Sequence, residues 1–132
     1  MNIESHKKAI RESLDVLEQC VQAGIQNRQR TVGFHCSAAS VDMLEIYLHS
    51  KNLIDPGTTI KHDFFSSQKI ALERVNPDFP RKAEIIGILA GIESKRTLLC
   101  YGKPQPQETI ESAIRLLNSL REILDGLGVA YE

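Results

Sequence analysis

The sequence predicts an all-α fold, an antiparallel up-and-down helical bundle of four long helices plus one short helix. Three observations predict it. Apolar residues recur at steps of three and four along four long segments, prolines and glycines separate the segments, and no segment alternates like a strand. The 132 residues, 42% of them hydrophobic, suffice for one core, so residues 1–132 are expected to form a single domain.

The first two helices are predicted from single apolar stripes. The first spans roughly residues 3–27, and its stripe consists of Ile10, Leu14, Leu17, Val21 and Ile25. The second spans roughly residues 31–51, and its stripe consists of Phe34, Ala38, Val41, Leu44 and Leu48. Small side chains at residues 37–40 let two helices approach closely, so this stretch is expected to pack against a neighbour.

The second half of the chain contains a short helix and two long ones. Residues 52–60 read as a loop, a short helix is predicted over 66–74, and Pro77 and Pro80 end it. A long helix follows over 81–99, and Gly87 and Gly91 predict a close helix crossing or a subunit contact on it. The last helix is predicted from residue 107 to the glycines at 126 and 128, with a stripe of Ile110, Ile114, Leu117, Leu120 and Leu124.

Charge and cysteine content restrict the function classes. The net charge of −1 gives no overall attraction to nucleic acid or to anionic membranes, so any phosphate-binding surface is expected to be local. The three cysteines match no zinc or disulfide pattern and are expected to be reduced, buried thiols. The polar N-terminus is unlike a signal peptide and no apolar run reaches a membrane span, so we expect a cytoplasmic protein with no membrane partner.

The stretch from Glu93 to Pro104 carries the clearest functional pattern. It places Lys95 and Arg96 near the end of a long helix, followed by Tyr101 and Lys103. One interpretation is structural: cations are favoured near a helix C-terminus, and Arg96 could pair with Glu93. The other is a phosphate clamp, because the planar guanidinium of arginine matches phosphate oxygens.

Three stretches resemble the HEPN superfamily, whose domains occur in prokaryotic toxin–antitoxin pairs and beside minimal nucleotidyltransferases. They are residues 34–39, which precede the helical residues 44–48, then Lys61-His62-Asp63, and then residues 96–102 before a loop and a final helix. The resemblance covers most of the chain. It implies RNA or nucleotide binding, a homodimer whose two motif copies form one groove, and no metal requirement.

The chain departs from the family at one position. Active ribonucleases of the family use a histidine as general base on a ribose 2′-hydroxyl, with an arginine on the phosphate. At the matching spacing from Arg96 this chain has Tyr101, and a phenol, which titrates near pH 10, is a poor base at pH 7. The resemblance therefore assigns the catalytic positions to Arg96 and Tyr101, and phosphate or substrate contacts to Lys95, Lys103, Lys61 and His62.

Several alternatives stay open. The leading hypothesis is an RNA- or nucleotide-binding protein, and the others are a metal-independent endoribonuclease toxin, a non-catalytic partner of a nucleotidyltransferase with Tyr101 as a modification target, and a scaffold without a ligand. Arg30 and His35 repeat the arginine–histidine spacing but are expected to face apart. No two histidines are three or four residues apart, so neither a metal site nor another cofactor is expected.

Overall fold

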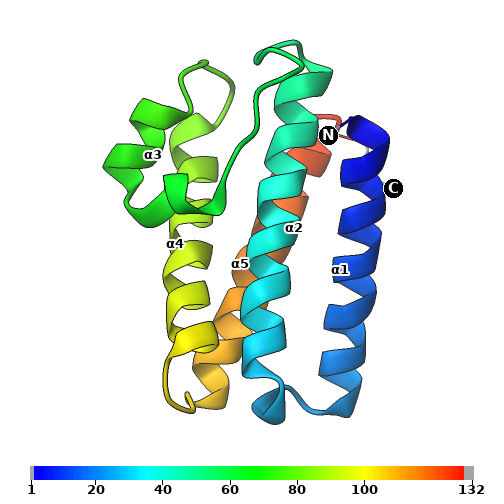
Figure 1. The fold of residues 1–132 in the computed structure, drawn as a ribbon, viewed down its shortest axis with the longest axis vertical. Coiled ribbons are helices and arrows are strands. Elements are labelled where there is room, and N and C mark those ends of the chain that lie inside the picture. Colours follow the sequence, from blue (N-terminus) through cyan, green and yellow to red (C-terminus); the bar gives the residue numbers. More distant parts are fainter. Residues whose placement is uncertain (1, 130–132) are drawn as a thin grey trace.

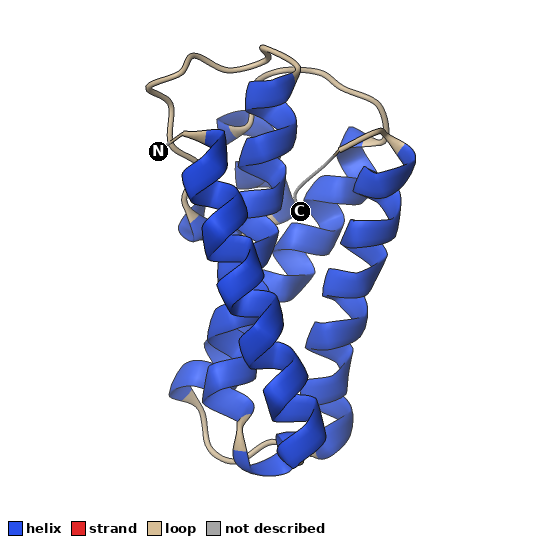
Figure 2. Ribbon diagram, turned by 90° about the vertical axis from the view of Figure 1, so that its right-hand side faces the viewer, coloured by secondary structure: helices blue, strands red, loops and turns tan. Residues whose placement is uncertain are grey.

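The computed structural model describes residues 2–129, and within them the chain forms five α-helices, two short 3₁₀ segments and no strand (Figure 2). The elements are α1 (Ile3–Ala23), η1 (Ile25–Asn27), α2 (Gln29–Ser50), η2 (His62–Ser66), α3 (Gln68–Arg74), α4 (Lys82–Tyr101) and α5 (Gln107–Gly126). The four long helices run along the long axis, and α3 lies to one side of α4 (Figure 1). The prediction of an all-helical chain is confirmed.

Local sequence signals set the helix ends close to their predicted positions. The side chain of Asn2 caps α1 by accepting a hydrogen bond from the Ser5 amide at 2.8 Å. Gly24, with φ of 98°, ends α1, so the last residue of the helix is Ala23 and not residue 27 as predicted. Residues 25–27 form η1 instead. The short helix starts at 68 because Ser67 caps it, its hydroxyl accepting from the Ile70 amide at 3.1 Å.

The core is built around α2, which packs against α1, α4 and α5. Its buried apolar residues are therefore spread around the helix and are not confined to one stripe. They are Val32, Cys36, Ala39, Met43, Leu44, Ile46, Tyr47 and Leu48. Burying each of the larger aliphatic side chains stabilises the fold by about 1.5–3 kcal/mol.

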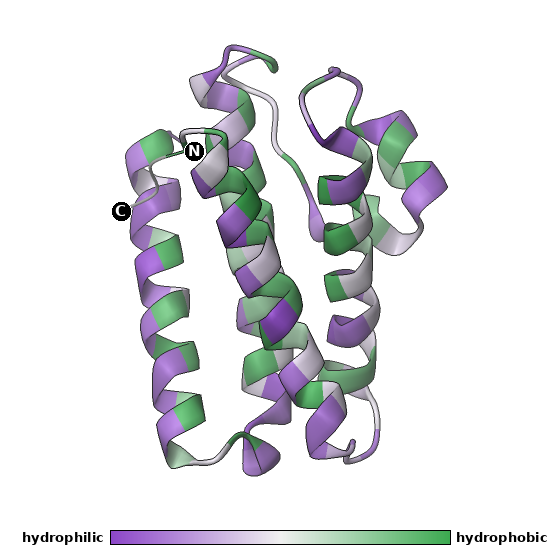
Figure 3. Ribbon diagram, turned by 180° about the vertical axis from the view of Figure 1, so that it is seen from behind, coloured by the Kyte–Doolittle hydropathy of each residue, from purple (hydrophilic) through white to green (hydrophobic). Residues whose placement is uncertain are grey.

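Two residues predicted for the core stripes lie at the surface. Val21 is 56% exposed because it lines a groove between α1 and α5, together with Ile114. Phe34 is 48% exposed because the first turns of α2 extend beside the end of α4. Figure 3 shows that the hydrophobic residues of α1, at the left edge, lie mainly on the side that faces the other helices.

Both glycines of α4 lie beside side chains of neighbouring helices. A Cβ at Gly91 would lie 3.2 Å from the Leu116 side chain of α5, and one at Gly87 would lie 3.5 Å from Gln68 of α3. The close crossing predicted for this helix is therefore present at Gly91, and a subunit contact on this face stays a prediction. The tightest crossing is at Gly33, where a Cβ would lie 2.8 Å from the Cβ of Leu99. Within residues 2–129 no helix has the length and apolar character that would let it cross a membrane.

Candidate functional site

The structure places Arg96 between two exposed aromatic rings. Its guanidinium carbon lies 5.9 Å from the ring centroid of Phe34 on α2 and 6.0 Å from that of Tyr101 at the end of α4. We call Phe34, Arg96 and Tyr101 the Arg96 surface. Tyr101 is 72% and Phe34 48% exposed, and Arg96 is partly exposed, so the arrangement lies at the surface of the protein. Each such contact is worth about 0.5–1 kcal/mol at an exposed site.

The guanidinium of Arg96 is not held by the nearest acid of its own helix. Glu93 directs its carboxylate to His62, whose Nδ1 lies 3.0 Å from each carboxylate oxygen. Within the described residues, the arginines that form ion pairs are Arg81 and Arg115. The pairing of Arg96 with Glu93 that the sequence allowed is therefore not formed, and the guanidinium edge is available to a ligand.

A groove of mixed charge lies beside the Arg96 surface. Arg96, Lys61 and His62 line it together with the carboxylates of Asp42 and Asp63. The structure thus brings two of the predicted substrate-binding residues to the side of Arg96, but it also brings two acids that repel a phosphate.

The other two predicted phosphate contacts lie outside the groove. Lys95 precedes Arg96 by one residue and is therefore rotated about 100° around α4. Lys103 is exposed in the loop that follows Tyr101. Its backbone carbonyl accepts a hydrogen bond from Gln29 Nε2 at 3.2 Å, so the loop is held while the side chain stays outside.

The first turn of α2 caps the end of α4 and thereby positions Tyr101. Arg30 Nε donates to the carbonyl of Cys100 at 3.0 Å, and Gln29 Nε2 donates to that of Leu99 at 3.2 Å. Carbonyls in the last turn of a helix have no partner within the helix, so these contacts satisfy them. His35 instead faces α1, where its Nδ1 lies 3.0 Å from Ser13 Oγ. Arg30 and His35 therefore do not converge, as the sequence predicted.

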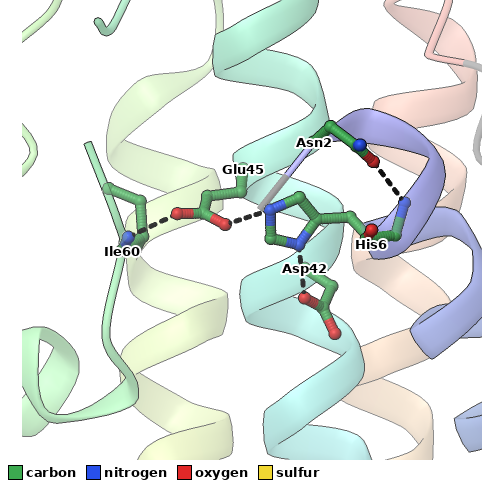
Figure 4. A network of polar contacts seen from close by, with 6 residues as sticks. Asn2, His6, Asp42, Glu45 and Ile60 are labelled. Carbon is green, nitrogen blue, oxygen red and sulfur yellow. Dashed lines mark hydrogen bonds and ion pairs between the residues drawn. The ribbon is translucent and has the colours of Figure 1, made fainter. Parts of the chain in front are cut away.

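A second cluster of polar side chains is buried between α1 and α2. His6 of α1 is 3% exposed, and its Nδ1 lies 2.7 Å from Asp42 Oδ1 (Figure 4). Its Nε2 lies 2.6 Å from Glu45 Oε2, and the other oxygen of Glu45 accepts a hydrogen bond from the Ile60 amide at 2.6 Å. Burial raises the pKa of Asp42, although the hydrogen bond from His6 opposes this shift. We call His6, Asp42, Glu45 and His49 the His6 cluster.

The imidazole of His49 lies beside His6 in this cluster and forms no hydrogen bond with the described residues. Its ring stacks on that of His6, with centroids 6.4 Å apart and planes 24° apart. The Nε2 atoms of both rings are buried and neither takes part in a hydrogen bond among the described residues. The short approach of His6 Nε2 to Glu45 is therefore an electrostatic contact without hydrogen-bond geometry. Unpaired buried nitrogens are costly, at about 1–3 kcal/mol each, and call for an explanation.

Comparison of the chain with protein-family models, with curated proteins and with solved structures gives no match. The relationship to the HEPN superfamily therefore stays a prediction that depends on residues 34–39, 61–63 and 96–102. The Arg96 surface and the His6 cluster are the two features of the structure that bear on its function.

Sequence reasoning missed the His6 cluster for a definable reason. It compared the spacing of histidines with one another, whereas the cluster combines one histidine of α1 with Asp42, Glu45 and His49 of α2. Steps of three and four place these α2 residues on one helical face. The signal was available, because Glu45 interrupts an otherwise apolar run of α2 that includes Leu44 and Ile46.

The three cysteines provide no reactive group. All are free and buried, and burial raises the pKa of the Cys36 thiol to about 12. Burial also raises the pKa of Cys20 and of Cys100, against the lowering effect of nearby arginines. The thiolate is the nucleophilic form, so we assign none of these thiols to chemistry.

Proposed function

We propose that the protein binds RNA or a nucleotide at the Arg96 surface, as a HEPN-type domain. The observation that carries the proposal is the position of the Arg96 guanidinium. It lies against two exposed rings, and it forms no ion pair with Glu93, because the Glu93 carboxylate contacts His62. A guanidinium fork is suited to phosphate oxygens, and exposed rings such as Tyr101 give bases a surface for stacking.

The surrounding charges favour one orientation of the ligand. The carboxylates of Asp42 and Asp63 in the neighbouring groove disfavour a phosphate there. We therefore assign the phosphate to Arg96 and the Tyr101 hydroxyl, with Lys103 on the following loop and Lys95 on the adjacent face of α4 as outer contacts. Lys61 and His62 line the groove that also contains the two acids, and His62 contacts Glu93, so we assign them a weaker contribution.

A homodimer of antiparallel up-and-down bundles fits the exposed apolar groups. Phe34, Leu98 and Tyr101 are 48%, 41% and 72% exposed, and a second copy placed over them would cover this area. It would also bring two Arg96 side chains to one groove, which gives local phosphate affinity in a chain of net charge −1. The proposal places the protein in a reducing cytoplasm, in keeping with its three buried free thiols.

A second candidate is a non-catalytic partner of a nucleotidyltransferase in a toxin–antitoxin pair. It is favoured by the exposure of Tyr101, since a phenol on the last residue of α4 is accessible to a modifying enzyme. Mass spectrometry of the chain purified from its native host checks this candidate. A mass increase on Tyr101 supports it, and an unmodified Tyr101 in every preparation counts against it.

Salt titration of RNA binding tests the leading proposal. We expect Arg96→Ala to weaken binding and to reduce the slope of log K against log salt by about 0.7–0.9 for each phosphate that the arginine neutralises. Arg74→Ala is the matched control, because Arg74 also lies over a phenylalanine ring, that of Phe64 at 5.4 Å, but away from this surface. Equal slopes for wild type and Arg96→Ala would remove Arg96 from phosphate binding.

The same preparations separate binding from catalysis. RNA is incubated with the wild-type chain, with Arg96→Ala and with Tyr101→Phe in the presence of a chelator. Binding without cleavage supports a binding protein. Cleavage by the wild type that both variants lose identifies the metal-independent endoribonuclease instead.

A further inference from the structure

The His6 cluster contains a set of three metal-binding side chains. We infer that His6, Glu45 and His49 form a site for a divalent transition-metal ion of the Zn²⁺ class. One ligand atom from each of the three lies within 4.8 Å of the other two, and two of these residues are fully buried. Two imidazoles with one carboxylate are a donor set that zinc accepts, with room for a further ligand.

The neighbouring groups hold the first two ligands in a suitable state. Asp42 Oδ1 lies 2.7 Å from His6 Nδ1, so the proton of a neutral imidazole is favoured on Nδ1 and the lone pair of Nε2 faces Glu45 (Figure 4). The Ile60 amide occupies Glu45 Oε1 at 2.6 Å, which leaves Oε2 for the ion. Carboxylate and backbone partners of this kind are typical of the groups that surround metal ligands.

His49 distinguishes a metal site from a buried ion network. A protonated His6 between Asp42 and Glu45 would account for both nitrogens of His6 without any metal. It would leave Nε2 of His49 buried and without a hydrogen-bond partner, on a ring that has a nitrogen within 4.8 Å of ligand atoms of His6 and Glu45. A cation accounts for His6 and His49 together, because it accepts the lone pairs of both and offsets the charge of the two carboxylates.

The ligand spacing requires only a small adjustment. Ligand atoms about 2.1 Å from a tetrahedral ion are roughly 3.4 Å apart. His6 Nε2 and Glu45 Oε2 are closer than this, at 2.6 Å, so both would separate slightly around the ion. The ion also has a path from solvent, since His49 lines a surface pocket with Asn2, Ile3 and Pro56 at the start of α1.

Binding of Zn²⁺ to the chelator-treated full-length chain tests this site. We expect one Zn²⁺ per chain by calorimetry, and a tetrahedral absorption spectrum when Co²⁺ replaces it. His49→Leu is the main variant, since the imidazole donates no hydrogen bond through Nε2 and the helix should fold without it. We expect it to weaken binding by at least about 100-fold, and Asp42→Asn to weaken it by about 10–100-fold.

His62→Leu is the matched control, because His62 is an exposed imidazole that contacts one carboxylate, Glu93. It should bind Zn²⁺ like the wild type. Thermal unfolding gives an independent readout: Zn²⁺ should raise the Tm of the wild type and of His62→Leu but not that of His49→Leu. Absence of saturable binding to the folded wild type, or equal binding by His49→Leu, would overturn the inference. Neither result depends on RNA binding at the Arg96 surface.

Discussion

At its C-terminal end α2 packs against α1 through charged side chains, whereas at its N-terminal end it packs against α4 through a glycine. Glu45 is 3% exposed and contacts His6 in the first region. In the second, Gly33 allows the backbone of α2 to approach Leu99, and the large polar and aromatic groups stay outside. The first region keeps its charges away from water, and the second presents Arg96 and Tyr101 to water.

The two regions differ in purpose: contacts in the first stabilise the fold, and side chains in the second are free to contact a ligand. Charges in a low-dielectric interior interact strongly, but they also lose hydration, so each depends on its partner. The pair of His62 and Glu93 also joins an imidazole to a carboxylate, at 3.0 Å against 2.6–2.7 Å for His6, but the side chain of His62 is 44% exposed and solvent screens the contact. Substitutions should therefore separate the two regions by their effect on the free energy of unfolding.

The largest expected effect is at Glu45. Glu45→Ala leaves His6 Nε2 and the Ile60 amide buried without their carboxylate. Leaving a buried donor such as the Ile60 amide without its partner typically costs about 1–3 kcal/mol, and the contact with His6 is lost as well, so we expect the free energy of unfolding to fall by at least this amount. Urea unfolding followed by circular dichroism, without added metal, measures the change.

Glu93→Ala provides the comparison, because it removes the carboxylate partner of an exposed histidine. A screened pair of this kind contributes about 0–1 kcal/mol, and we expect a loss in that range. Equal losses for Glu45→Ala and Glu93→Ala would show that burial does not distinguish the two pairs, and the contrast between the regions would fail.

The second effect concerns the crossing of α2 and α4. Gly33→Ala places a methyl group 2.8 Å from the Cβ of Leu99, which is too close without a shift of one helix. Overpacking of this kind costs about 1–3 kcal/mol, although alanine also brings up to about 1 kcal/mol of helix propensity. We expect a net destabilisation in urea unfolding, with weaker RNA binding because Phe34 moves with the helix.

Gly87→Ala is the control for the glycine substitution. Its added methyl would meet only the Gln68 amide, at an ordinary contact distance of 3.5 Å. Helix propensity then dominates, and we expect stabilisation by about 0.5–1 kcal/mol. If Gly33→Ala were as stabilising as Gly87→Ala, the helices would not be in close contact at that point.

The helices were predictable from the sequence because their signals are local. The apolar stripes of the first and last helices, and the prolines at 77 and 80, predict elements that the structure confirms within a few residues. Which helices pack together is not a local property. Val21 is exposed although it lies on the stripe, because it lines the groove between α1 and α5, and no residue of α1 by itself signals this.

The sites were predictable only in part, for the same reason. Arg96 and Tyr101 were singled out together by the resemblance, but five residues on one helix rotate them about 140° apart, so the distance of 6.0 Å between the guanidinium and the ring was not implied by their spacing. Phe34 could not be inferred, because it reaches Arg96 from a different helix. The burial of Glu45 could not be predicted either. A charged residue within an apolar run is usually assigned to the surface when its partner, here His6 on α1, is not known.

The smallest expected effect belongs to His35, a partly buried imidazole that lies 3.0 Å from the Ser13 hydroxyl. Burial lowers the pKa of His35 below its ordinary value of 6.5, and the charge of Glu12 only partly opposes this. The unfolded chain therefore binds a proton at a higher pH than the folded chain does. Stability from this group is fully present above about pH 6.5 and is lost as the pH falls through the lowered pKa.

His35→Gln should remove this contribution. Urea midpoints measured between about pH 8 and about pH 5 should fall less steeply in the variant than in the wild type, since the uncharged amide does not titrate. A steeper fall in the variant would mean that the pKa of His35 is raised by folding. The charge of Glu12 would then outweigh the effect of burial on His35.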